Sequence, residues 1–306
     1  MPWNELIDEL AACRDWNYHA GGPLSTEPAA MTALALIGHG QIAAARPALD
    51  WIRELQTSAG SVGVTATQAE PTWATALAIV AWGHYERAQK TISDAAETKS
   101  DSYQDAIDSA QSFLLTQKGL PIPENDVMGH DSTLIGWSWA ADTHSWIEPT
   151  SLHVWALKMT GLQDHDRTRE AVRLLVDRQI PGGGCNYGNT FVLDQKLMPH
   201  HQPTAICLLT LMGEDETAVT IDGQNRRDMT VGYLARQWPQ VVGTSSTCYA
   251  AMALAAYDRV PDDLDVRLNE LLARRRPTTG THSLALIALA ASRRECPLAT
   301  MFAEMN

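Results

Sequence analysis

The sequence predicts an all-helical fold, an (α/α)6 toroid in which six inner helices are surrounded by six outer helices. Two observations support this prediction. The first is a repeated phrase, which occurs as Glu27-Pro28-Ala29, Glu70-Pro71-Thr72, Glu148-Pro149-Thr150 and, with an amide, Gln202-Pro203-Thr204. Each copy precedes an apolar run, so the phrase indicates a repeated supersecondary unit. We expect its Pro at the first helical position, where the missing N–H costs nothing.

The second observation is that two kinds of segment alternate along the chain. Amphipathic segments with one charged face predict outer helices at about 3–13, 42–57, 102–117, 166–179, 225–237 and 262–275. Segments that are apolar all round predict buried inner helices at about 28–38, 71–85, 149–160, 203–213, 245–257 and 281–293. Six such hairpins can close into a ring, whereas an open solenoid must cap its terminal faces. An open helical solenoid is the alternative.

No composition shift marks a domain boundary, so we expect residues 1–306 to form a single domain. An irregular insertion interrupts the repeat at about 120–146. The predicted turns between outer and inner helices begin with a Gln and continue with Gly and aromatic residues. The Gln residues are Gln56, Gln117, Gln179 and Gln237. A Gln side chain has donors and an acceptor with which it can tie a turn to a neighbouring helix end.

This order of helix, Gln, Gly-rich turn, Glu-Pro-Thr and apolar helix resembles the repeat of the squalene–hopene cyclase and protein prenyltransferase β-subunit superfamily. The resemblance is carried by Trp51 and Ile52 with Gln56 and Gly60, and by Gln179 with Gly182 to Gly184 and Tyr187. It covers most of the chain and implies the toroid fold. The superfamily contains terpene cyclases, protein prenyltransferases and domains without catalysis, so the resemblance leaves open whether the protein is an enzyme.

The acid motif of the cyclases, Asp-x-Asp-Asp-Thr, falls on residues 146–150. Glu148 then takes the place of the protonating Asp, while Trp146 and Pro149 replace the other acids. The zinc ligands of the prenyltransferases are not matched, because Ser246 stands at the position of the His ligand. We therefore predict neither a metal site nor a cofactor.

The inner helices are expected to begin around one shared mouth. Polar side chains at their starts and aromatic residues of the turns are the predicted substrate-binding set: Trp16, Tyr18, Glu27, Glu70, Trp73, Trp137, Trp139, Trp146, Tyr187 and Gln202. Aromatic faces stabilise cations by about 0.5–2 kcal/mol each, which suits carbocation chemistry, and they also suit stacking on sugar rings. The alternative is that these aromatics plug the turns as structural repeat residues.

The predicted catalytic residues are Glu148, Asp142 and His144. They lie in or just after the insertion, and long loops on rigid scaffolds often carry function. Asp142 can act as a general acid or base, with His144 or Glu148 as its partner. The alternative is a packed insertion in which these side chains only support turns.

Charge and composition limit the partners. A net charge of −13 argues against nucleic acid, and nothing in the sequence indicates contact with a membrane surface. Five cysteines without metal-ligand spacing suit a reducing compartment, and we expect a cytoplasmic protein. The oligomeric state stays open. The first functional hypothesis is a terpene cyclase- or prenyltransferase-like protein that acts on or binds an apolar isoprenoid. A carbohydrate-active (α/α)6 enzyme with paired carboxylates, or a non-catalytic binding scaffold, is the alternative.

Overall fold

The computed structural model describes residues 2–92, 102–124 and 128–300. This part of the chain is mostly helical, with thirteen α-helices and two short antiparallel hairpins. The hairpins pair β1 (Phe191–Val192) with β2 (Gln195–Lys196) and β3 (Thr220–Ile221) with β4 (Gln224–Asn225). Among the described helices, none is both long and apolar enough to span a bilayer. Residues 125–127 of the expected insertion lie outside the described residues.

The contacts divide the chain into two compact units. Unit 1 comprises Met1–Thr116 and Asp263–Pro297, and unit 2 comprises Gln117–Asp262 and Leu298–Asn306. Unit 1 contains α1 (Pro2–Ala12), α2 (Thr26–Gly38), α3 (Ile42–Glu54), α4 (Ala74–Ile92), α5 (Gln104–Thr116), α11 (Leu264–Ala273), α12 (Thr281–Ala291) and η5 (Arg293–Glu295). Unit 2 contains α6 (Ile147–Met159), α7 (Asp166–Asp177), α8 (His201–Thr210), η3 (Thr217–Val219), α9 (Arg226–Gln237), η4 (Trp238–Gln240) and α10 (Thr244–Ala256). The short α13 (Pro297–Thr300) contains the boundary.

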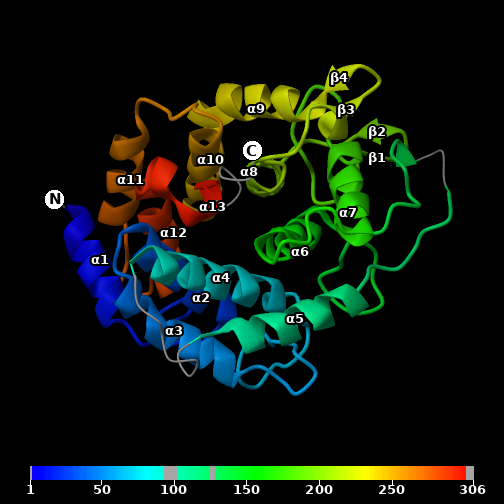
Figure 1. The fold of residues 1–306 in the computed structure, drawn as a ribbon. Helices are drawn as coiled ribbons and strands as arrows, with labels where there is room; N and C mark the ends of the chain where they lie inside the picture. The colour runs from blue at the N-terminus through cyan, green and yellow to red at the C-terminus, as the bar shows by residue number, and fades with distance from the viewer. Residues whose placement is uncertain (1, 93–101, 125–127, 301–306) are drawn as a thin grey trace. The chain divides into compact units, whose positions relative to one another are not determined.

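In unit 1 the last hairpin of the chain packs against the first. Helix α2 contacts α3, α4 and α12, and α12 also contacts α1 and α11 (Figure 1). The Ala20 N–H donates to the Thr278 carbonyl at 3.2 Å. The His282 N–H donates to the Asn17 carbonyl at 3.0 Å. Residues about 260 positions apart therefore join the turns of these two hairpins.

In unit 2, helix α8 is the central packing element. It contacts α6 and α10, and α9 packs against both α8 and α10. Helix α7 packs against α6. The apolar face of α7 includes the buried residues Val172 and Leu175. Every residue of α6 is buried. The pairing of an outer helix with a fully buried inner one matches the two segment types of the sequence.

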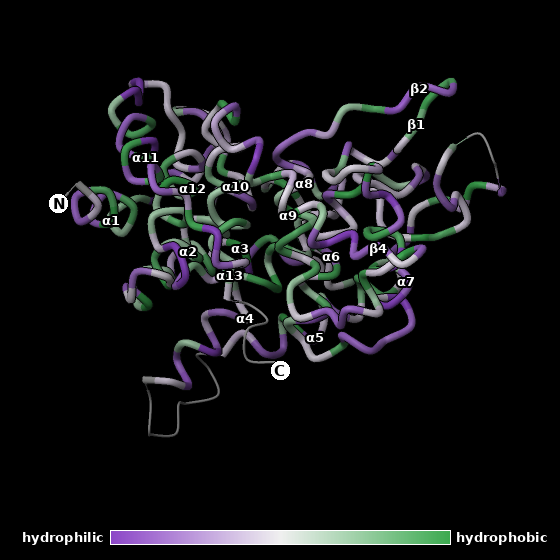
Figure 2. Tube along the Cα trace, turned by 90° about the horizontal axis from the view of Figure 1, so that it is seen from above, coloured by the Kyte–Doolittle hydropathy of each residue, from purple (hydrophilic) through white to green (hydrophobic). Residues whose placement is uncertain are grey.

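The predicted alternation of helix types is confirmed along the chain. The odd-numbered helices α1 to α11 expose one face, and the even-numbered helices α2 to α12 are buried over most of their length. Figure 2 shows hydrophilic and hydrophobic residues interspersed along the outer helices α1 and α11. Helix α12, by contrast, buries eight of its residues from Thr281 to Ala290. Burial of apolar side chains is the main driving force for this arrangement.

The repeated Pro lies two positions further into the helix than the sequence predicted. Pro28, Pro149 and Pro203 are each the third residue of their helix. The prediction of the first helical position was therefore wrong. The physical reason is that all N–H groups of the first turn lack an intrahelical partner, so Pro costs no hydrogen bond at the third position either.

A threonine in the first turn of several inner helices fastens the preceding turn. The Oγ1 of Thr150 accepts from the Trp137 N–H at 3.0 Å and donates to the Trp137 carbonyl at 3.2 Å. Thr204 makes the same pair of bonds with Cys185, at 2.8 and 3.3 Å. These reciprocal bonds give the repeated Thr of the Glu-Pro-Thr phrase a physical role.

The second copy of the phrase does not play this part. In unit 1 the reciprocal bonds to the turn residue Val62 come from Thr75, at 2.8 and 3.2 Å, and not from Thr72. Helix α4 begins only at Ala74, so Glu70 precedes it and is exposed. Our expectation that Glu70 opens an inner helix was wrong. When Thr75 is aligned with Thr150, Trp73 occupies the position that corresponds to Glu148.

The predicted ties are present at two of the four glutamines, Gln56 and Gln179. The Gln56 Nε2 donates to the Gly60 carbonyl at 3.2 Å and to the Ala106 carbonyl of α5 at 2.9 Å. Gln179 Oε1 accepts from the Thr230 hydroxyl of α9. Both side chains thus join the end of one amphipathic helix to the next amphipathic helix.

Candidate functional site

The turns and helix starts place side chains at equivalent positions in successive repeats. In α2, α6 and α8, the residue before the helix donates its N–H to the carbonyl of a buried turn residue. These bonds run from Ser25 to Trp16 at 2.8 Å, from Trp146 to Trp137 at 3.0 Å and from His200 to Cys185 at 2.8 Å. Two residues after these turn anchors stand Tyr18, Trp139 and Tyr187. The second residue of each helix is Glu27, Glu148 or Gln202. An aromatic side chain and a carboxyl or amide therefore recur together.

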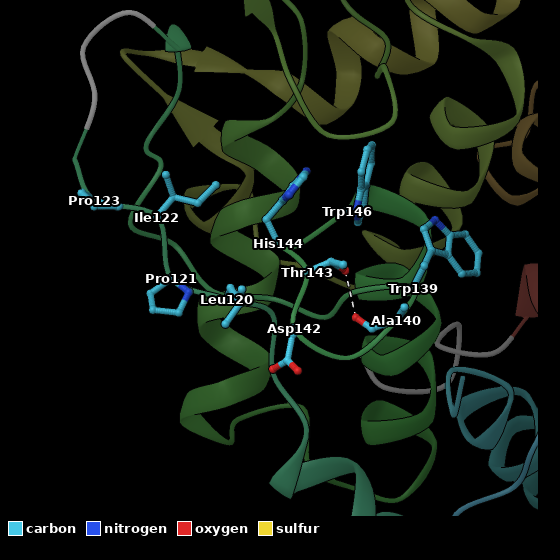
Figure 3. Close-up of a pocket in the computed structure, with 10 residues that line it drawn as sticks. All are labelled: Leu120, Pro121, Ile122, Pro123, Trp139, Ala140, Asp142, Thr143, His144 and Trp146. Atoms are coloured by element: carbon cyan, nitrogen blue, oxygen red, sulfur yellow. Dashed lines mark hydrogen bonds between the residues drawn. The ribbon is translucent and has the colours of Figure 1, made fainter. Parts of the chain in front are cut away.

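An open pocket of about 550 Å³ lies beside this position in unit 2 (Figure 3). Ten residues line it: Leu120, Pro121, Ile122, Pro123, Trp139, Ala140, Asp142, Thr143, His144 and Trp146. The Leu120 N–H donates to the Thr143 carbonyl at 2.8 Å, which fixes the apolar segment against the loop. The Thr143 hydroxyl donates to the Ala140 carbonyl at 2.8 Å. Both sides of the pocket are thus held by local hydrogen bonds.

Trp139, His144 and Trp146 form what we call the aromatic wall of the pocket. All three are half-buried, and the rings of His144 and Trp146 lie 4.6 Å apart at 31°. Trp146 immediately precedes α6, so its backbone is fixed by the hydrogen bond to the turn. The wall therefore offers apolar ring surface that is held in place and still accessible from the pocket.

Asp142 lines the same pocket but does not pair with His144. Its side chain is exposed, and its backbone φ of 57° is in the left-handed region, which Asp tolerates better than most residues. In Figure 3 the Asp142 carboxylate and the His144 ring extend in opposite directions from the loop. The structure thus brings Asp142 and His144 to one pocket without joining them.

Glu148 is the buried carboxylate next to the aromatic wall. It is the second residue of α6, two positions after Trp146, and it is 8% exposed. The Gln202 Nε2, from the equivalent position of α8, donates to Glu148 Oε1 at 3.2 Å. An amide donor and the N-terminal end of a helix both favour a negative charge at this point. The structure therefore brings together two predicted site residues that are 54 positions apart.

Tyr187 and Trp137 have opposite environments. Tyr187 is 42% exposed, and its ring stacks on His200 with centroids 4.9 Å apart. Trp137 is buried, stacked on His153 at 5.0 Å, with the Arg167 guanidinium 4.4 Å from its ring centroid. Burial lowers the pKa of His153 to about 4. Trp137 thus belongs to the core behind the site.

The predicted residues of unit 1 form a second cluster, which we call the Glu27 cluster. The Tyr18 hydroxyl donates to Glu27 Oε2 at 2.5 Å, and His282 Nε2 of α12 lies 3.5 Å from Glu27 Oε1. Burial acts to raise the pKa of Glu27. The charge of His282 and the hydrogen bond from Tyr18 outweigh burial and hold this pKa below its usual range. Burial, together with the Glu27 charge, raises the pKa of Tyr18.

The other predicted residues of unit 1 are placed differently. Trp16 is buried against Trp51, with ring centroids 5.8 Å apart. Trp73 is half-buried just before α4, and Glu70 is exposed. Whether these residues, or Tyr18 and Glu27, contact a substrate stays a prediction.

Sequence reasoning missed His282 and the apolar side of the pocket. His282 is the second residue of α12, the position that Glu27 and Glu148 hold in their helices. Aligning all inner helices by their first turn could have identified it. Residues 120–123 carry no such signal, because they are held by bonds of the backbone, from the Leu120 N–H to the Thr143 carbonyl and from the Ser132 hydroxyl to the Pro123 carbonyl. Within the described residues, no group of three or more His, Cys, Asp or Glu is arranged to hold a metal ion.

The fold resembles that of proteins with solved structures. A structure described as a glycosidase with one glutamate replaced by alanine superposes with a TM-score of 0.57 and 11% sequence identity. The match covers 97% of this chain and 97% of the other. It is one of 27 matching chains. No protein family model matches the chain, and no curated protein matches its sequence. At 11% identity the similarity shows the helical fold alone.

Proposed function

We propose that the protein is a carbohydrate-active enzyme of the (α/α)6 toroid type, with a saccharide bound in the pocket of unit 2. The observation that carries the proposal is the open pocket whose wall consists of Trp139, His144 and Trp146. Ligand sites combine apolar and aromatic surface with a few polar groups. The apolar face of a sugar ring suits such a wall, and its hydroxyl groups suit Asp142 and His144. The resemblance of the fold to a glycosidase supports the same choice.

Closure of the hairpins into a toroid is part of this proposal. It is supported by the packing of α12 against α2 and by the bonds that join the turn at Asn17 to α12. In a ring of this kind the inner helices begin on one side. Glu27, Glu148 and Gln202 would then share that side with the turn aromatics.

The proposed reaction is hydrolysis of a glycosidic bond by two carboxyl groups. Glu148 takes a proton from water as the water oxygen bonds to the anomeric carbon. The bond between that carbon and the leaving oxygen breaks, and Asp142 gives the leaving oxygen a proton. The Gln202 amide and the helix start suit Glu148 to the role of base. The place of Asp142 in the pocket suits it to the role of proton donor.

Substitution of Trp139 tests the binding part of this proposal. Trp139→Ala should weaken binding of neutral saccharides roughly 10-fold or more, because a large aromatic contact surface is lost. Trp139→Phe is the matched control and should retain most of the affinity. Isothermal titration against xylo-, cello-, manno- and malto-oligosaccharides measures both. Failure of the unmodified chain to bind any saccharide in a wider glycan array would refute the proposed function.

A second candidate is an isoprenoid-processing protein of the terpenoid cyclase-like class. It is favoured by the apolar side of the pocket at residues 120–123 and by the match of Glu148 to the cyclase acid motif. The ligand preference of the unmodified chain discriminates the two candidates. Turnover or tight binding of squalene or a prenyl diphosphate, with no response to saccharides, would favour the isoprenoid candidate.

A further inference from the structure

A further aromatic ring, that of Tyr187, is exposed in the turn that follows α7. The ring of Tyr187 is backed by His200 at 4.9 Å and 34°, and the residue is 42% exposed. Its backbone is fixed on both sides. The Tyr187 N–H donates to Asn186 Oδ1 at 2.8 Å, and the Tyr187 carbonyl accepts from the Ile147 N–H at 2.8 Å. The ring therefore belongs to an ordered turn and is not a loose surface side chain.

The bond to Ile147 places this turn beside the aromatic wall. Ile147 directly follows Trp146, a wall residue, in the chain. A Cβ added at Gly188 would lie 3.5 Å from Trp146 Cε3 and 3.5 Å from the Ser145 carbonyl oxygen. The segment after Tyr187 therefore lies close to Trp146. Two aromatic surfaces, one from each turn, are neighbours in unit 2.

Glu148 and Gln202 lie at the helix starts that carry these two surfaces. Glu148 is two residues after Trp146, and Gln202 is two residues after His200, the support of Tyr187. The 3.2 Å hydrogen bond between the Glu148 and Gln202 side chains therefore connects the two surfaces. A ligand that covers both surfaces would extend over this carboxylate.

We propose that Tyr187 forms a second stacking subsite and that the substrate is a neutral oligosaccharide of at least two sugar residues. One residue lies on the aromatic wall and the next lies on Tyr187, so that the linkage between them is close to Glu148. This inference rests on the proposed function. The neutral substrate follows from the net charge of −13 and from the two carboxylates at the site, which repel acidic sugars.

The test measures how binding depends on oligosaccharide length. The full-length Glu148→Gln chain, in which turnover is blocked, is titrated with xylo-, cello-, manno- and malto-oligosaccharides of one to four residues. Affinity should rise from the monosaccharide to the longer chains in the series that binds. Adding Tyr187→Ala should remove roughly 5- to 30-fold of affinity for chains of two or more residues and leave the monosaccharide unchanged.

Tyr187→Phe is the matched control, because it keeps the ring and removes only the hydroxyl. It should bind all lengths as the parent does. An unchanged length dependence in Tyr187→Ala would overturn the second subsite, and so would an equal loss at every length. In both cases saccharide binding itself persists, so the proposed function stands. Absence of saccharide binding at every length in the parent chain refutes the proposed function and this inference together.

Discussion

Glu27 in unit 1 and Glu148 in unit 2 hold the same position in the repeat but have different neighbours. Both are the second residue of an inner helix and precede a Pro. Glu27 is bonded by the Tyr18 hydroxyl and lies 3.5 Å from His282 of the last hairpin. Glu148 is bonded by Gln202. One carboxylate thus joins distant hairpins, while its equivalent lies beside an open pocket.

The turn aromatic makes the difference between the two positions. Tyr18 directs its hydroxyl to Glu27, so that the cluster is closed by hydrogen bonds within the protein. Trp139, at the equivalent turn position, lines the pocket. We infer that the repeat supplies the carboxylate for architectural reasons and that the turn residue differs in role, because Tyr18 bonds Glu27 whereas Trp139 lines a pocket.

The largest expected effect is on activity and comes from Glu148→Gln. A positioned acid–base group contributes about 10²- to 10⁴-fold to a rate, so hydrolysis of the saccharide substrate should fall by that factor. The melting temperature should stay nearly unchanged, because the amide oxygen can still accept from Gln202. Steady-state kinetics and thermal unfolding measure the two effects.

The Glu27→Gln chain is the matched control for this experiment, since it makes the same change at the equivalent repeat position. It should keep most of its activity. Equal activity of Glu148→Gln and the parent would remove Glu148 from the mechanism. A large drop in its melting temperature would instead assign it the architectural role that we give to Glu27.

The second expected effect is on stability and comes from Glu27→Gln. A hydrogen bond to a charged group contributes about 1.5–3 kcal/mol, so we expect a loss of roughly that size in the free energy of unfolding. Because the pKa of Glu27 is lowered in the folded state, its contribution is present above the unfolded-state pKa. It is lost as the pH falls through the folded-state pKa.

Urea unfolding of the parent and Glu27→Gln at several pH values measures this contribution. The difference between the two chains should be present at neutral pH and disappear in acid. A difference that grows in acid would contradict the assignment of Glu27 as an ionised partner of Tyr18 and His282.

The helices and their order could be predicted because their signal is local. Apolar periodicity distinguished outer from inner segments, and the repeated phrase placed Glu27, Glu148 and Gln202 at helix starts. The copy Glu70-Pro71-Thr72 was misleading because the threonine that fastens the turn is Thr75, three residues after the threonine of the phrase. Sequence similarity alone does not indicate which Thr makes that bond.

The contacts of the site were harder to predict, because they depend on loop backbone and on distant partners. Asp142 and His144 are two residues apart in the chain, yet the left-handed backbone at Asp142 separates their side chains. His282 meets Glu27 across 255 residues of sequence. Closeness in the sequence therefore wrongly suggested that Asp142 and His144 are paired. The large separation of His282 and Glu27 gave no indication of their contact.

The smallest expected effect is on stability at the turn residue and comes from Tyr18→Phe. This change removes the hydroxyl that donates to Glu27 and keeps the ring, which is 42% exposed. Water can replace part of the lost bond, so the free energy of unfolding should fall by about 1 kcal/mol. Tyr187→Phe, with the same exposed fraction and its ring on His200, should have less effect on stability. A double-mutant cycle of Tyr18→Phe with Glu27→Gln isolates their interaction. A coupling energy of zero would show that the Tyr18 hydroxyl does not help Glu27 join the two hairpins.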